Sequence, residues 1–174
     1  MEDRINEKWK ENEFNSIIAK VPKSKGIYAI VFKISKSVRL YSIKMFKNRV
    51  IEKGLYVYIG SARGPGGLRA RIKRHLMKKK RRKWHIDYLT TLEYFKPIAI
   101  IYAITDQDLE YKVSELLSNY LPIPVRKFGS TDKPSKAHLF KCNEYNECIN
   151  ILCSIFKSLN LSPKVIYFYK VNSN

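Results

Sequence analysis

Short runs dense in β-branched and aromatic residues limit the possible folds more than anything else in this chain. They occupy residues 26–34 (GIYAIVFKI), 55–62 (LYVYIGSA) and 96–105 (KPIAIIYAIT). Runs of this length, bounded by glycine, proline and polar residues, predict β-strands. Residues 37–46 (SVRLYSIKMF) predict a further strand. The first three strands along the chain have short connections, which predicts an antiparallel meander.

Apolar residues at helical spacing separate these runs. Leu68, Ile72 and Leu76 recur every four residues within 67–79, which predicts an amphipathic helix. A later helix is expected to begin with Asp106 as its N-cap. Further helices are predicted at 2–19, 106–121 and 143–160, one or two helical turns at 84–95, and a last strand at 164–171.

Alternation of strands and helices predicts an α/β fold, with a small mixed or antiparallel sheet flanked by helices. The 174 residues, of which 45% are hydrophobic, suffice for a single core. We therefore expect one domain over residues 1–174. Its core spans about 24–140, preceded by the helix at 2–19 and followed by a helix–strand extension at 141–174.

The charge of the chain is large and unevenly distributed. The formal net charge is +19, which opposes compaction by self-repulsion and is typical of proteins with a polyanionic partner. Between Lys53 and Ile86 there is no acidic residue. That segment predicts a nucleic-acid-binding surface, although a charge run is often only a solvated face. Its candidate phosphate contacts are Arg63, Arg69, Lys73, Arg74, Lys78, Lys79, Lys80, Arg81, Arg82 and Lys83.

Cysteine usage and hydropathy bear on the compartment. Cys142, Cys148 and Cys153 form no CxxC pair and fall at the start of or within the predicted last helix, so that neither a disulfide framework nor a zinc site is expected. No signal peptide and no apolar run of the length of a membrane span is present. These observations predict a cytoplasmic protein of the reducing intracellular environment, with no membrane partner.

Two tripeptides and the residues after them carry a resemblance. Gly26-Ile27-Tyr28 begins one predicted strand and Tyr58-Ile59-Gly60 lies near the end of another. Arg71 follows eleven residues after Gly60, His75 four residues later, and an acid lies on a later helix. This order, over about residues 26–140, resembles the GIY-YIG nuclease superfamily. The stretches GLYVYIGSARGPGGLRARIKRHL, KWHIDYL and FGSTDKPSKAHLF are similar to a little-characterised branch of it, found largely in archaea and bacteria.

The resemblance implies phosphodiester hydrolysis with one divalent metal ion and an activated water. Tyr28 would be the general base or its relay, and Tyr58 would position the water or a base partner. A phenol has a pKa of about 10, so that it needs nearby cations to ionise at neutral pH. The arginine-rich helix is expected to supply this field. Without catalysis, strand tyrosines of this kind pack and bond backbone groups.

Arg71 and His75 lie four residues apart on one helix face. By the resemblance, Arg71 would contact the scissile phosphate bidentately, and His75 would share a proton with a tyrosine. The alternatives are a nonspecific phosphate clamp for Arg71 and a surface position for His75. The metal acid would be Glu110 or Glu115; Glu110 fits better because it follows a leucine and precedes Val113 by three residues. One carboxylate with several waters suits Mg²⁺ or Mn²⁺.

Four further residues match motifs of the branch. His85 and Asp87 would line the cleft, or else cap a helix and pair with an arginine. Asp132 and His138 would be supporting residues or ligands. This chain departs from the branch where two cysteines are usual, since it has Lys133 and Ser135 there, and Ala137 in place of a serine.

The sequence therefore predicts a metal-dependent DNA endonuclease, with repair or recombination substrates expected from the resemblance. The alternative is a DNA- or RNA-binding module that keeps the scaffold without turnover. The loop at Gly64–Gly67 lacks the spacing of an ATP-binding phosphate loop. Its glycines would instead allow the backbone to approach DNA or a phosphate at the start of the helix.

Overall fold

Five antiparallel strands form the central sheet, in the order β6-β4-β1-β5-β7. The computed structural model describes residues 11–132 and 134–169. The three long strands are β1 (Gly26–Ile34), β4 (Gly54–Ala62) and β5 (Phe95–Ile104). β1 lies between the other two and pairs with both of them. The edges are the shorter strands β6 (Leu139–Cys142) and β7 (Lys164–Tyr167).

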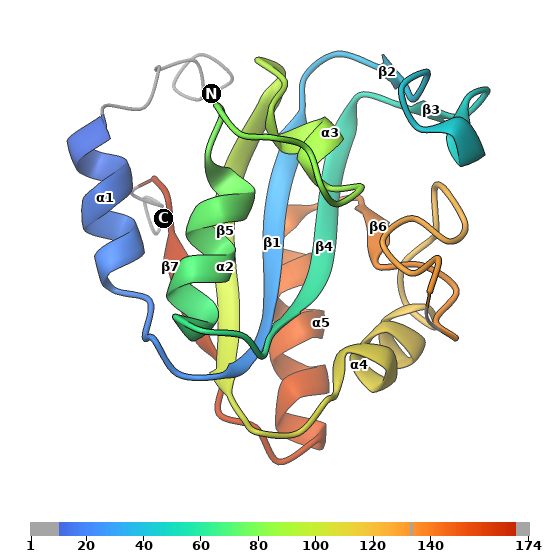
Figure 1. Ribbon diagram of the computed structural model, residues 1–174. Helices are drawn as coiled ribbons and strands as arrows, with labels where there is room; N and C mark the ends of the chain where they lie inside the picture. Colours follow the sequence, from blue (N-terminus) through green and yellow to red (C-terminus); the bar gives the residue numbers. More distant parts are fainter. Residues whose placement is uncertain (1–10, 133, 170–174) are drawn as a thin grey trace.

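Helices cover both faces of this sheet, as Figure 1 shows. One face carries α1 (Glu11–Ala19), α2 (Gly67–Leu76) and α3 (Asp87–Thr90), and the other carries α4 (Glu110–Leu117) and α5 (Tyr145–Ser158). Each face has its own apolar cluster, and alternate residues of β1 enter the two clusters. Because both faces are covered, the long strands are apolar at nearly every position. The predicted fold class, an antiparallel sheet flanked by helices with an N-terminal helix and a C-terminal helix and strand, is confirmed.

The start of α2 is fixed against the chain that leads into β1. Gly67 has φ +55°, and a Cβ there would overlap the carbonyl oxygen of Lys23. The N–H of Leu68 donates to Ser24 O at 2.9 Å. The Arg69 guanidinium donates to two carbonyls at the end of α1, Val21 O at 2.6 Å and Ala19 O at 2.9 Å. This network sets the direction of α2 over the sheet.

The meander predicted for the first three strands is wrong. β1 pairs directly with β4, and the intervening chain forms a separate two-stranded sheet of β2 (Val38–Arg39) and β3 (Val50–Ile51), with the 3₁₀-helix η2 (Lys44–Phe46) between them. Leu40, Ile43 and Phe46 are buried at a spacing of three. This spacing belongs to turns and 3₁₀-helix rather than to a strand.

Several other boundaries differ from the sequence prediction. α4 begins at Glu110 with Leu109 as its N-cap, not at Asp106. α2 ends at Leu76 rather than at residue 79, and strand β6 was not predicted. The residues of the predicted helix and strand that fall at 2–10 and 170–171 lie outside the described part of the chain.

The cysteine prediction is also wrong. Cys142 lies in β6, not in a helix, and it forms a disulfide with Cys148 at the start of α5. Cys153 is a free thiol. The sequence-based argument from cysteines to a reducing compartment therefore does not hold. Within the described residues, no helix combines the length and apolarity needed to cross a membrane.

Candidate active site

Tyr28 and Tyr58 lie on neighbouring strands and on the same face of the sheet. Tyr28 is paired with Gly60 across β1 and β4. A Cβ at Gly60 would overlap the Tyr28 hydroxyl, so that the phenol occupies the space above this glycine. Tyr58 lies two residues before Gly60 and therefore points to the same side. Both rings are deep, with exposed fractions of 1% and 5%.

His75 reaches both tyrosines from α2. It follows Leu68 and Ile72 on the buried stripe of the helix, at positions i, i+4 and i+7. Its ring centroid lies 6.0 Å from that of Tyr28 and 5.9 Å from that of Tyr58. The alternative of a surface histidine is wrong, because His75 is buried.

Asp87 holds His75 from behind. Its buried carboxylate lies 3.4 Å from His75 Nδ1, and it accepts from Arg74 Nη1 at 3.0 Å and from the N–H groups of Lys83 and Trp84 at 2.8 and 3.0 Å. Burial by itself raises the pKa of Asp87, but these hydrogen bonds and the Lys80 charge outweigh it and hold the pKa well below the usual range. Asp87 is thus an anion, and it pairs with an arginine as one sequence alternative proposed.

The same surroundings set the state of His75. Burial lowers the pKa of His75, against the opposing effect of Asp87. The imidazole is therefore neutral at neutral pH, and the Asp87 carboxylate favours the tautomer with the proton on Nδ1. In that tautomer Nε2 is a hydrogen-bond acceptor.

Arg71 stacks on the indole of Trp84, with its guanidinium carbon 4.5 Å from the ring centroid. Arg74 and Lys83 contact the same ring at 4.2 and 5.0 Å. Stacking fixes the plane of a guanidinium and leaves its N–H edge for a planar acceptor. Trp84 had no role in the sequence analysis, and only its place beside His85 in the KWHIDYL stretch could have drawn attention to it.

The expectation that this helix lowers the pKa of the phenols is wrong for the protein by itself. Burial raises the pKa of Tyr28 well above its ordinary value, and Tyr58 and Glu110 add to the rise. Burial, followed by Glu110, likewise raises the pKa of Tyr58. Arg71 lowers both pKa values, but only in part. Both tyrosines are therefore neutral at physiological pH.

Glu110 enters the site at the end of β4. Strand β6 pairs with β4 only as far as Tyr58, with one more bond from Ile59 N–H to His138 O. The next N–H group of β4 that points toward the β6 side is that of Ser61, and it donates to Glu110 Oε1 at 3.1 Å. The buried carboxylate thus provides a hydrogen-bond acceptor for an N–H group at the edge of β4. Glu115 lies five residues further along α4, about 140° around the helix axis. Glu110 raises the pKa of both phenols, whereas Glu115 is not among the groups that shift them.

We call residues 118–138, between α4 and β6, the late loop. It closes the site from the side of β6. His138 is buried, with its Nδ1 3.7 Å from Glu110 Oε1 and its ring 6.4 Å from that of Tyr58. His85 does not cap a helix; its Nδ1 accepts from the Gly129 N–H at 3.0 Å. Burial lowers the pKa of His85, and the exposed Asp132 opposes this.

Ser135, where the related branch has a cysteine, contributes its main chain to the loop. Its carbonyl oxygen accepts from Ser130 Oγ at 3.0 Å and from Lys127 Nζ at 3.2 Å. Lys133 lies outside the described residues.

The predicted phosphate contacts divide into two groups. Arg63, Arg69, Arg74, Lys78 and Lys80 donate to acceptors within the protein. Lys80 is the clearest case, since its side chain is only 5% exposed and its ammonium bonds the carbonyls of Arg74 and His75 at the end of α2. Lys80 is therefore a C-terminal cap of α2 rather than a surface cation. The second group, Lys73, Lys79, Arg81 and Lys83, is exposed. Arg63, Lys78 and Arg82 are exposed as well, although each of them donates a hydrogen bond within the protein.

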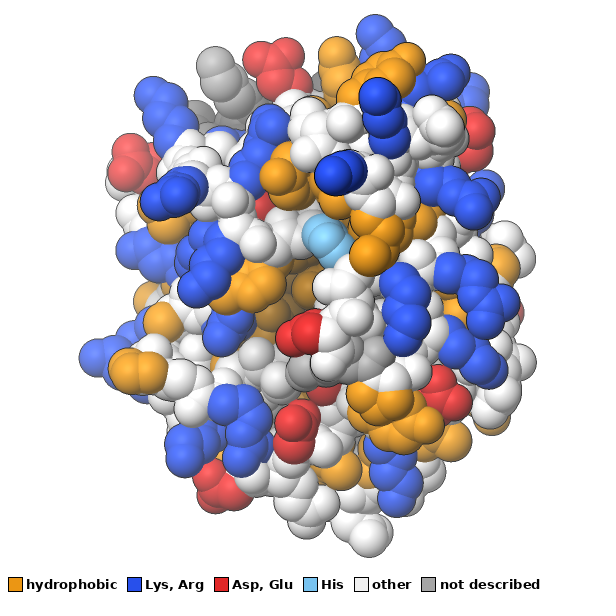
Figure 2. All heavy atoms as spheres, turned by 45° about the vertical axis from the view of Figure 1, so that its right-hand side comes forward, with side chains coloured by type: hydrophobic (Ala, Val, Ile, Leu, Met, Phe, Trp, Pro, Cys, Tyr) orange, Lys and Arg blue, Asp and Glu red, His pale blue; other side chains and the backbone are white. Residues whose placement is uncertain are grey.

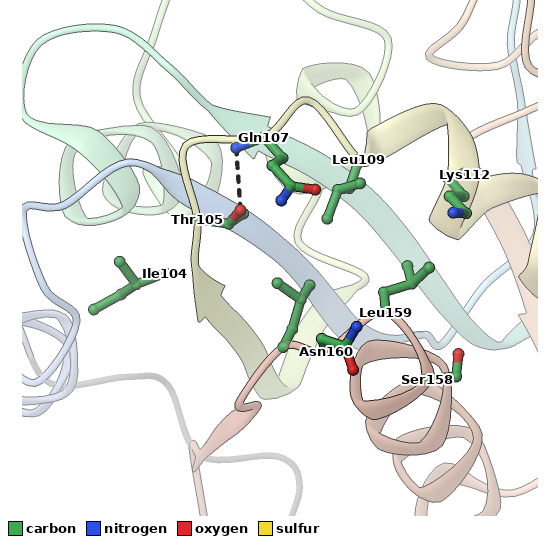
Figure 3. Close-up of a pocket in the computed structure, with 9 residues that line it drawn as sticks. Ile104, Thr105, Gln107, Leu109, Lys112, Ser158, Leu159 and Asn160 are labelled. Atoms are coloured by element: carbon green, nitrogen blue, oxygen red, sulfur yellow. Dashed lines mark hydrogen bonds between the residues drawn. The ribbon is translucent and has the colours of Figure 1, made fainter.

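The surface agrees with this arrangement. Figure 2 shows a hollow on this face of the molecule, with side chains in the hydrophobic colour inside it. A His and an acidic side chain lie at its edge, and Lys and Arg lie to its left and right. A different pocket lies between the β5–α4 connection and the end of α5, lined among others by Ile104, Gln107, Leu109 and Asn160 (Figure 3). None of the candidate catalytic residues lines that pocket.

Glu110 is the candidate carboxylate for a metal ion. Among residues 11–132 and 134–169 there is no group of three His, Cys, Asp or Glu side chains able to hold an ion. Mg²⁺ commonly takes one or two carboxylates and completes its shell with waters and substrate phosphates. Glu110 fits that mode, because its oxygen Oε1 is held in place by Ser61.

Comparison with known proteins identifies a family. No curated protein and no solved structure matches the chain. A family model matches residues 27–161, from the second residue of β1 to just beyond α5. The matched range contains Tyr28, Tyr58, His75 and Glu110 and covers most of the chain. The protein therefore belongs to the family described as Domain of unknown function DUF123.

Proposed function

We propose that this protein is a metal-dependent DNA endonuclease of the GIY-YIG superfamily. One observation carries the proposal: Tyr28, Tyr58, His75 and Glu110 come from four separate elements, β1, β4, α2 and α4, and interact at one place. Arg71 supplies a positive charge that lowers the pKa of both phenols. A base, an orienting hydroxyl, a cation and a carboxylate are the groups that phosphodiester hydrolysis requires.

Glu110 would hold the metal ion, Mg²⁺ or Mn²⁺. When bound, such an ion polarises a phosphoryl oxygen and lowers the pKa of bound water. The chain supports this placement by fixing Glu110 Oε1 on the Ser61 N–H. His138, 3.7 Å from the same oxygen, adds a group that orients the carboxylate.

The proton would move along Tyr28 and His75. A neutral phenol both accepts and donates a hydrogen bond, so that Tyr28 acts as a relay: it takes a proton from the attacking water and gives its own to His75 Nε2. Asp87 supports this step because it holds the opposite nitrogen, Nδ1, and stabilises the imidazolium that forms. Tyr58 would position the water, and Arg71 would bind two oxygens of the phosphate.

The charge of the protein supports DNA as the substrate class. The net charge of +19 and the exposed cations after α2 match a phosphate backbone. Repair or recombination substrates follow from the resemblance to the superfamily alone, which is an argument by analogy.

A second candidate is a nucleic-acid-binding module without turnover. The observation that favours it is the depth of the tyrosines, since exposed fractions of 1% and 5% leave little of either phenol accessible to a phosphate. Under this alternative the basic surface binds nucleic acid while the tyrosines only pack the core.

A cleavage assay with plasmid and branched DNA in Mg²⁺ or Mn²⁺ distinguishes the endonuclease from the binding module. Tyr28→Phe, Arg71→Ala and Glu110→Gln each lower the cleavage rate by at least about 100-fold, while DNA affinity changes little. Glu115→Gln, on the same helix, is the matched control and retains cleavage. Tight DNA binding with no cleavage by the wild type in either metal would establish the binding module instead.

A further inference from the structure

Residues 35–53 form a lobe that stands apart from the central sheet. It consists of β2, η2 and β3, and Figure 1 shows it at the upper right, beyond the ends of β1 and β4. We call it the β2–β3 lobe. None of the proposed catalytic residues belongs to it, so that its ordered structure has no part in the proposed chemistry.

The inner side of the lobe is anchored. Phe46 packs against His85 and Phe128, with ring centroids 5.0 and 5.8 Å apart. The Leu40 N–H donates to Arg49 O at 2.9 Å, and Ser37 Oγ donates to Glu52 Oε2 at 2.9 Å. Because His85 also holds Gly129 of the late loop, the lobe is tied to the wall of the candidate active site.

The outer side exposes two large apolar side chains. Tyr41 is 63% exposed and Met45 is 64% exposed. The Arg39 guanidinium lies 5.5 Å from the centre of the Tyr41 ring. Both side chains are therefore accessible to a ligand.

The lobe that carries these two residues is strongly cationic, which indicates an anionic partner. The only carboxylate of the lobe is Glu52, and it is bonded to Ser37. In Figure 2 hydrophobic side chains stand among Lys and Arg at the top of the face, where the lobe comes forward. The cations of the lobe are Lys36, Arg39, Lys44, Lys47, Arg49 and Lys53.

We propose that the β2–β3 lobe binds an unpaired, single-stranded segment of nucleic acid, with a base stacked on Tyr41 and the backbone phosphates on the surrounding cations. An aromatic face beside lysines and arginines is the arrangement that binds single strands without reading their sequence, whereas a paired base has its faces covered by its neighbours. Charge complementarity favours this ligand over an apolar protein partner. The inference rests on the proposed function only in taking nucleic acid as the ligand, and it narrows the substrate to DNA with an unpaired strand near the duplex.

Binding without divalent metal tests the lobe independently of cleavage. The full chain is titrated by fluorescence anisotropy into a duplex with a single-stranded oligothymidine overhang and into a blunt duplex of the same sequence. Tyr41→Ala weakens binding to the overhang duplex by about tenfold and to the blunt duplex by less than about twofold. Tyr41→Trp retains overhang binding. Tyr120→Ala, which removes a tyrosine that is 64% exposed on another part of the surface, is the matched control and changes neither.

The outcomes separate the two proposals. Equal binding of Tyr41→Ala and wild type to the overhang duplex overturns the lobe inference, and leaves the proposed cleavage intact. Loss of overhang binding in a protein that never cleaves DNA supports the lobe and refutes the endonuclease. Equal losses on both DNAs also overturn the inference, because they show that Tyr41 contacts the duplex rather than an unpaired base. Tyr41 is exposed, so that circular dichroism of the variant is expected to match that of the wild type.

Discussion

The hydroxyl of Tyr28 lies directly over the Cα of Gly60, in space that any side chain at residue 60 would fill. The two residues are register partners on β1 and β4. This contact gives a physical reason for a tyrosine on one strand and a glycine on the next, since the small residue makes the room that the phenol occupies.

Gly60→Ala is therefore expected to displace Tyr28. Overpacking of this kind costs about 1–3 kcal/mol in the free energy of unfolding, and the moved phenol also lowers DNA cleavage. Urea denaturation measures the first effect. Gly64→Ala is the control, because a Cβ at Gly64 meets no atom within 4 Å. Equal stability of the two variants would contradict the contact.

The lowered pKa of Asp87 predicts that the stability of the fold depends on pH in the acidic range. Hydrogen bonds and the Lys80 charge outweigh burial and hold its pKa below the ordinary value, so that Asp87 stabilises the fold fully above about pH 4. That contribution is lost as the pH falls further, because the unfolded state then binds the proton more readily. Asp87→Asn removes it, and leaves the cations Arg74 and Lys80 without their anion.

The measurement is urea denaturation of wild type and Asp87→Asn at neutral and at acidic pH. The variant is less stable at neutral pH by about 3–5 kcal/mol, and the difference narrows as the pH falls below about 4. Asp132→Asn, at an exposed position, serves as the control and follows the wild type. A difference that stays constant with pH would show that Asp87 does not titrate as described.

Lys79 and Lys80 are neighbours with opposite predicted effects. Lys80 caps the carbonyls at the end of α2 and bonds Thr90 Oγ1 at 2.8 Å, while Lys79 is exposed. Lys80→Gln is expected to lower the unfolding free energy by about 1–3 kcal/mol, with little change in the salt dependence of DNA binding. Lys79→Gln leaves stability unchanged and reduces the slope of log affinity against log salt by about one. If Lys80→Gln instead reduced the salt slope and left stability unchanged, Lys80 would be a phosphate contact.

Local patterns were enough to predict the long strands and α2. β1, β4 and β5 carry dense apolar runs, and Leu68, Ile72 and Leu76 mark the buried side of α2. These signals lie within single segments, so that no knowledge of distant contacts is needed. The segment at 37–46 shows the opposite case. Its alternating residues favoured a strand, but the packing of Phe46 on His85 and Phe128, which are remote in sequence, decided the outcome.

The order of residues along the chain was enough to predict which residues form the candidate site. It did not predict which cations bond within the protein or how burial shifts the pKa values. The sequence shows a row of equivalent cations, whereas the fold gives Lys78 and Lys80 internal acceptors near residues 90–95. Likewise, the pKa of Tyr28 depends on how far the ring is buried, and burial outweighs Arg71. Both properties arise from tertiary contacts that a linear pattern does not contain.

Trp84 provides the last prediction, because its indole holds Arg71 by stacking at 4.5 Å. Trp84→Leu removes the aromatic face but keeps an apolar side chain, so that the guanidinium loses its fixed plane. If Arg71 binds the phosphate in the transition state, the cleavage rate constant falls by about tenfold or more, while DNA affinity, which rests on many cations, changes by less than about twofold.

The matched control is Tyr88→Leu, which removes a similar stacking contact from Arg82, 5.1 Å from its ring. Arg82 has no part in the proposed chemistry, so that cleavage by this variant is expected to equal that of the wild type. Single-turnover cleavage with saturating protein separates the rate constant from binding. A Trp84→Leu protein that cleaves at the wild-type rate would show that Arg71 needs no stacking partner. A loss in affinity alone would make Arg71 a binding cation rather than a catalytic one.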